Sequence, residues 1–159
     1  MEISELFGLP AHPLFVHAAV VLLPLAAIAT LLVAVVPRLR RYAGAALVLA
    51  IVALVFVGLA QGSGEELEEH VEETPLVEEH AGEGERVLPW AIGLVVVSGI
   101  VVALPRLEAR FPNASSPPAT AVLVVVTLVA SVGAMWSVIE VGHSGAKATW
   151  NDVTESEND

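Results

Sequence analysis

Four long stretches without any Asp, Glu, Lys or Arg constrain the fold of this chain more than any other feature. They run over residues 14–36, 42–64, 87–105 and 111–139. The hydrocarbon core of a bilayer is about 30 Å thick, which roughly 20 helical residues cross. Because backbone groups in lipid must find partners within their own segment, such stretches form helices. The pattern predicts an all-α chain that forms an antiparallel four-helix transmembrane bundle.

Proline positions and composition set the expected limits of these helices. Pro13 and Pro75 suit the first turn of a helix, where a missing N–H costs nothing. We expect helices over about residues 13–36, 42–70, 75–104 and 118–148, in a single membrane domain that covers residues 1–150. Residues 151–159, NDVTESEND, are polar and acidic, and we expect them to form a disordered tail.

The overall composition excludes several classes of protein. The 159 residues are 55% hydrophobic, and the mean hydropathy of +0.74 is too high for an ordinary soluble domain. A net charge of −11 argues against a nucleic-acid partner, because nucleic-acid binding needs a basic face. Without cysteine the chain forms no disulfide, iron–sulfur cluster or thiolate metal site.

The positive side chains predict the orientation in the membrane. Only Arg86 and Lys147 lie on the side of the termini. The two short connections between helices carry the other five cations, which are Arg38, Arg40, Arg41, Arg106 and Arg110. Loops rich in Lys and Arg stay in the cytoplasm. We therefore expect a multi-pass protein of the plasma or inner membrane with both termini outside and an acidic outer cap around residues 65–86.

The predicted membrane core holds few polar groups. Thr30, Ser98, Thr127 and Ser131 are its only polar side chains, and no ionisable residue lies near the midplane. Ion and proton pathways usually need such residues. We therefore do not expect a channel or transporter built from one copy. The many small residues favour close helix packing, with lipid, a second copy or a partner in a membrane complex on the outside.

The histidines are the main candidates for chemistry. All five lie at the predicted outer surface, among many glutamates, and they are His12, His17, His70, His80 and His143. Imidazole nitrogens bind zinc, copper and haem iron. We predict a site for zinc, copper or haem formed by His12, His17, His80 and His143, with Glu79 and Glu140 orienting the rings through hydrogen bonds.

Two histidines need separate remarks. In a continuous helix the rings of His12 and His17 point about 140° apart. His12 therefore joins His17 only if its backbone, just before Pro13, is not helical. His70 lies in a run of glutamates, and we expect it to be solvent-exposed.

Other functions compete with metal or haem binding. The histidines could form hydrogen bonds between helices in a non-catalytic accessory or assembly subunit of a membrane complex. Histidines among glutamates also titrate near neutral pH, as in a pH sensor. No catalytic residue or reaction follows from the sequence, so whether the chain is an enzyme stays open.

Several segments resemble a known family. They are LPAHPLFVHAAVVLLPLAA, QGSGEELEE, PLVEEHAGEGE and VGHSGAKATW, and together they are similar to the predicted integral-membrane family catalogued as domain of unknown function 2231. The resemblance covers nearly the whole chain. It implies the four-helix topology and favours His12, His17, His80 and His143 over His70, but it implies no reaction.

Overall fold

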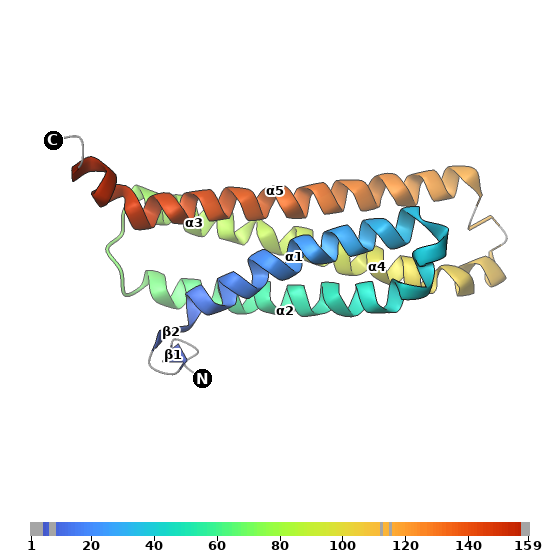
Figure 1. Cartoon of the computed structure of the whole chain (residues 1–159), viewed down its shortest axis with the longest axis horizontal. Coiled ribbons are helices and arrows are strands. Elements are labelled where there is room, and N and C mark those ends of the chain that lie inside the picture. The colour runs from blue at the N-terminus through green and yellow to red at the C-terminus, as the bar shows by residue number, and fades with distance from the viewer. Residues whose placement is uncertain (1–4, 7–8, 112, 115, 157–159) are drawn as a thin grey trace.

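The computed structural model describes residues 5–6, 9–111, 113–114 and 116–156, with side chains described between residues 11 and 150. Two short strands, β1 (Glu5–Leu6) and β2 (Leu9–Pro10), pair antiparallel before the first helix. The helices are α1 (Ala11–Val35), the 3-10 helix η1 (Pro37–Tyr42), α2 (Ala43–Glu68), α3 (Pro75–Glu85), α4 (Val87–Arg110) and α5 (Pro117–Ser156). Figure 1 shows their arrangement.

The long helices form an antiparallel bundle, which confirms the predicted fold class. Helix α1 packs between α2 and α5, and α4 packs between the same two helices on the other side. Helices α1 and α4 also touch each other across the centre of the bundle. Helix α3 continues the line of α4 and lies against α5 (Figure 1). The chain therefore consists of two helical hairpins, a first hairpin of α1, η1 and α2, and a second hairpin of α3, α4 and α5.

Several helix boundaries differ from the expected ones, and α4 ends at Arg110 where we expected about residue 104. We expected one helix from residue 75 to 104, but the chain is divided at Arg86 into α3 and α4. Pro89 gives a reason, since it has no N–H to donate to the carbonyl of Glu85 one turn earlier. Helix α5 continues to Ser156, so residues 151–156 are helical where we expected the disordered tail.

Small side chains fill the interior, and large apolar side chains cover its outside. Ala26, Ala53, Ala91 and Ala134 are completely buried, at 0% exposure. On the surface, by contrast, Val21, Val122 and Ile139 are each more than 60% exposed. A soluble protein would bury such residues, whereas lipid solvates them as well as a protein interior does.

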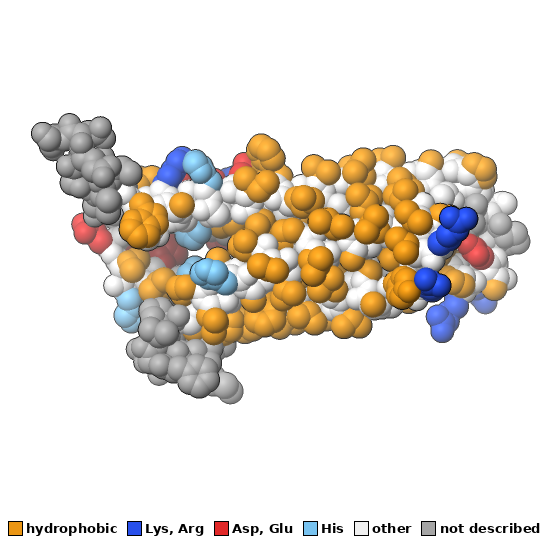
Figure 2. All heavy atoms as spheres, viewed as in Figure 1, with side chains coloured by type: hydrophobic (Ala, Val, Ile, Leu, Met, Phe, Trp, Pro, Cys, Tyr) orange, Lys and Arg blue, Asp and Glu red, His pale blue; other side chains and the backbone are white. Residues whose placement is uncertain are grey.

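Four helical stretches of the described residues are long and apolar enough to cross a membrane. They are Ala11–Val35, Pro37–Glu68, Pro75–Arg110 and Pro117–Trp150. Figure 2 shows a middle zone covered by hydrophobic side chains, with histidines at one end and a cluster of Lys and Arg side chains at the other. We call the end with Arg38, Arg40, Arg41, Arg106 and Arg110 the arginine end. The opposite end, with the five histidines and most of the glutamates, is the histidine end.

Among the described residues, the buried hydroxyl side chains of the bundle interior all have hydrogen-bond partners. Thr30 Oγ1 and Ser98 Oγ lie 2.8 Å apart and join α1 to α4 directly across the bundle. Ser131 Oγ donates to the Ala27 carbonyl at 3.1 Å, and Thr127 Oγ1 donates to the Leu123 carbonyl at 2.7 Å. Because an unpaired hydroxyl in an apolar interior is costly, this pairing is what allows these residues to be buried.

The Thr30–Ser98 hydrogen bond should show energetic coupling. We expect Thr30→Val and Ser98→Ala each to lower the free energy of unfolding by about 1 kcal/mol, because each leaves one buried hydroxyl without its partner. The double variant should be less destabilised than the sum, with a coupling energy of about 0.6 kcal/mol or more. Unfolding in mixed detergent micelles measures this. Thr149→Val, at an exposed position of α5, is the control, and additive effects with Ser98→Ala are expected there.

Candidate histidine site

His12 is held at the start of α1 by the neighbouring helix α2. Its Nδ1 lies 2.9 Å from the Ala60 carbonyl oxygen and 3.4 Å from Ser63 Oγ. A carbonyl oxygen can only accept, so Nδ1 carries the proton and donates it to Ala60. The Ser63 hydroxyl itself donates to the Leu59 carbonyl at 2.8 Å. In the neutral ring, the other nitrogen, Nε2, is therefore left with a free lone pair.

His80 is held in the same way by α5. Its Nδ1 lies 3.2 Å from Ser144 Oγ, and the Ser144 hydroxyl donates to the Val141 carbonyl at 3.2 Å. Because that hydroxyl has only one hydrogen, its oxygen accepts the proton of His80 Nδ1. Ser144 is itself buried, with 3% of its surface exposed. As in His12, the neutral ring keeps the lone pair on Nε2.

The rings of His12 and His80 lie close together at the histidine end. Their centroids are 6.4 Å apart, and their planes are close to perpendicular, at 81°. Both side chains are half-buried. The structure thus brings together one histidine from each hairpin, and both present the same unprotonated nitrogen.

Glycines make the room that these rings occupy. A Cβ atom added at Gly145 would lie 2.8 Å from His80 Cε1, closer than real contacts allow. A Cβ added at Gly64 would lie 3.0 Å from His12 Cε1. A glycine inside a helix usually weakens it. Gly64 and Gly145 nevertheless lie inside the continuous helices α2 and α5, and what they provide is space for an imidazole ring.

The two histidines occupy equivalent positions in the two hairpins. Each ring bonds to the last helix of its own hairpin. His12 bonds to α2 next to the dipeptide Ser63-Gly64, and His80 bonds to α5 at the dipeptide Ser144-Gly145. Thr30 follows His12 by the same number of residues as Ser98 follows His80, and these two hydroxyls also meet across the bundle. The hairpins are therefore related by an approximate two-fold axis along the bundle, and His12 and His80 meet on it.

The remaining histidines lie apart from this pair. His17 and His70 are exposed. His17 Nδ1 bonds to the Pro13 carbonyl of its own helix, and His70, in the turn after α2, bonds through Nδ1 to the Glu66 carbonyl near the end of that helix. His143 is exposed as well. Because α1 already begins at Ala11, the backbone of His12 is helical, and its ring does not turn toward His17.

The two glutamates predicted to orient the rings also lie elsewhere. Glu79 is exposed on α3, and Glu140 is half-buried beside Arg86 in a groove between α4 and α5. The groups that orient His12 and His80 are the Ala60 carbonyl and the Ser144 hydroxyl. Sequence reasoning missed Ser63 and Ser144. The signal that could have identified them is the Ser-Gly dipeptide that α2 and α5 share, Ser63-Gly64 in one helix and Ser144-Gly145 in the other.

The described residues contain no group of three or more His, Asp or Glu side chains placed to hold a metal ion. A site at the histidine pair therefore has two protein ligands. Neutral imidazole with its second nitrogen hydrogen-bonded is the form in which histidine binds metals, and the second bond fixes the tautomer and the ring orientation. Imidazole nitrogens of this kind are ligands that suit copper and zinc.

The chain matches one known family. A family model described as "Predicted membrane protein (DUF2231)" covers residues 8–158, which include both hairpins and every histidine. No curated protein and no solved structure matches the chain.

The glycine next to Ser144 should be intolerant of a side chain. We expect Gly145→Ala to lower the melting temperature of the detergent-purified protein, since the new methyl group meets the His80 ring and overpacking costs about 1–3 kcal/mol. Gly142→Ala on the same helix is the matched control, because nothing lies within 4 Å of a Cβ there. It should leave stability unchanged or raise it, since alanine favours helix more than glycine does. Equal effects of the two substitutions would contradict the packing described for His80.

Proposed function

We propose that this chain, which belongs to the DUF2231 family of predicted membrane proteins, binds a transition metal ion through His12 and His80. The observation that supports this most is the shared state of the two rings. Each has Nδ1–H engaged by a protein acceptor, which leaves two free Nε2 lone pairs on rings whose centroids are 6.4 Å apart. Metal–nitrogen bonds are about 2.0 Å long, and the 6.4 Å between the centroids is short enough for both rings to reach one ion.

The proposed role is metal handling or redox chemistry at the cell envelope. Zinc sites that only stabilise a fold use four protein ligands, and catalytic ones use three. Two imidazoles hold an ion less completely, so that it can be passed on or can accept a further ligand. Copper and zinc both suit imidazole. Among the histidines, His12 and His80 are the ligands of this proposal, and His17 and His143 lie outside it.

Metal titration of the purified protein tests the proposal. We expect one copper or zinc ion per chain by elemental analysis, and loss of that ion in His12→Ala and in His80→Ala. Ser144→Ala should weaken binding by roughly 10- to 100-fold, as loss of a group that orients a ligand does. His70→Ala is the matched control and should bind like the wild type, because the exposed His70 ring bonds to the nearby Glu66 carbonyl and lies apart from the pair.

Three outcomes would count against two-histidine metal binding. Stoichiometric metal that survives both His12→Ala and His80→Ala would place the ion elsewhere. A Soret band in the optical spectrum would identify haem as the group bound instead. Absence of metal after loading, together with lower stability of the histidine variants, would favour the rival function. In that case the rings serve as hydrogen-bonded contacts between helices in an accessory or assembly subunit.

We further propose that the histidine end faces the outside of the cell. The support is the distribution of cations, five of which lie at the arginine end in the two short connections between helices. Positive loops remain in the cytoplasm. The proposed metal site would then be reached from the outer side of the membrane.

Single-cysteine labelling tests the orientation, since the chain has no cysteine of its own. Glu72→Cys, between α2 and α3, should react with a membrane-impermeant maleimide in intact cells. Asn113→Cys, between α4 and α5, should react only after the membrane is opened. Both positions are exposed, so a difference in labelling reports the side of the membrane. The reverse pattern would place the histidine end in the cytoplasm.

A further inference from the structure

A groove runs along the surface of the bundle between α4 and α5, near the histidine end. Its volume is about 650 Å³, within the usual range of ligand pockets. No histidine lines it, so it is separate from the His12–His80 pair. We propose that this groove binds one phospholipid whose headgroup is zwitterionic and carries a primary ammonium, of the phosphatidylethanolamine class.

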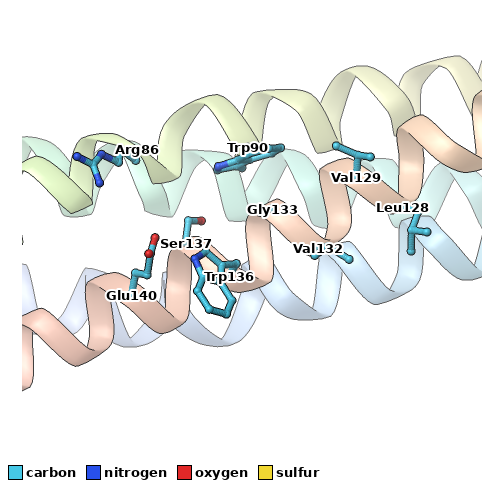
Figure 3. A pocket seen from close by; sticks show the side chains of 9 residues that line it. All are labelled: Arg86, Trp90, Leu128, Val129, Val132, Gly133, Trp136, Ser137 and Glu140. Carbon is cyan, nitrogen blue, oxygen red and sulfur yellow. The ribbon is translucent and has the colours of Figure 1, made fainter.

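The long wall of the groove is apolar and shaped by two tryptophans. The Trp90 ring lies directly over Gly133 of α5, where an added Cβ would be 2.3 Å from Trp90 Cε3. Figure 3 shows Trp136 beside this contact, with Val132 and Val129 continuing the surface toward the arginine end. Trp136 is 61% exposed, and many other large apolar residues of the bundle are exposed as well. An acyl chain fits such a surface, and tryptophan is enriched where membrane meets water.

The polar end of the groove carries one charge of each sign. Arg86, at the start of α4, and Glu140, on α5, line this end from opposite sides (Figure 3). Among the described residues neither side chain has a hydrogen bond or an ion pair with another residue. A cation and an anion that both remain available, at the edge of an apolar groove, complement a headgroup that itself has both charges.

The donor and acceptor chemistry selects the class of lipid. A guanidinium binds a phosphate group through two parallel hydrogen bonds. A primary ammonium has three N–H donors for the Glu140 carboxylate, whereas the quaternary ammonium of a choline headgroup has none. A purely anionic headgroup would bring its charge close to Glu140. Phosphatidylethanolamine is therefore favoured over both.

Tryptophan quenching by brominated acyl chains tests the site. The background is Trp150→Phe, so that only Trp90 and Trp136 fluoresce. In vesicles of mixed composition, brominated phosphatidylethanolamine should quench more than brominated phosphatidylcholine or phosphatidylglycerol, with a preference of roughly threefold to tenfold. Glu140→Gln should remove the preference over phosphatidylcholine. Arg86→Gln should weaken the binding of every phospholipid headgroup.

Matched controls keep the test specific to the groove. Glu72→Gln and Arg106→Gln change the same charges at exposed positions away from it, and they should leave the lipid preference intact. Equal quenching by the three lipids in the parent protein, or a preference that survives both groove variants, would overturn the proposal and leave only ordinary boundary lipid. The result is independent of metal binding, because His12→Ala should not alter it.

Discussion

Close approach of helix backbones across an interior lined by alanine is the constraint on which the rest of this structure depends. Ala26, Ala53, Ala91 and Ala134 have no exposed surface, and they let α1, α2, α4 and α5 pack with little side-chain volume between them. In lipid, where burial of apolar surface gives little gain, such close packing and interhelical hydrogen bonds are what hold helices together. The Thr30–Ser98 bond is short because α1 and α4 touch, and the same approach brings His12 to His80 at one end.

The candidate site follows from repetition of one local arrangement. In each hairpin a histidine near the start of the first helix donates through Nδ1 to the second helix, beside a Ser-Gly pair whose glycine leaves room for the ring. The histidines outside the site, in contrast, have no histidine at the equivalent position of the other hairpin. In the same alignment of the hairpins, His143 corresponds to Gly62 and His17 corresponds to Glu85, and all four of these positions are exposed.

The fold could be predicted from the sequence, and the site only in part. Stretches without charge report spans directly, because the length needed to cross a bilayer is fixed. The break at Arg86 does not follow from the sequence, because Pro89 is as compatible with a kink in one long helix as with the first turn of a second helix. The pairing of His12 with His80 depends on which faces of two hairpins meet, and hydropathy says nothing about that when helices are apolar on every side. The sequence predicts that His17 and His143 lie at the same end of the bundle as the pair, whereas the helix face on which each histidine lies decides which rings meet.

The two hairpins are connected through the chain only by residues 69–74 at the histidine end. An ion bound on the two-fold axis would form a second connection, since one ligand comes from each hairpin. Binding of the ion and association of the two hairpins would then be linked, because anything that binds only the assembled bundle stabilises it by mass action. Separation of the hairpins would remove one of the two ligands from the ion. A partner that separates them would therefore cause release of the ion.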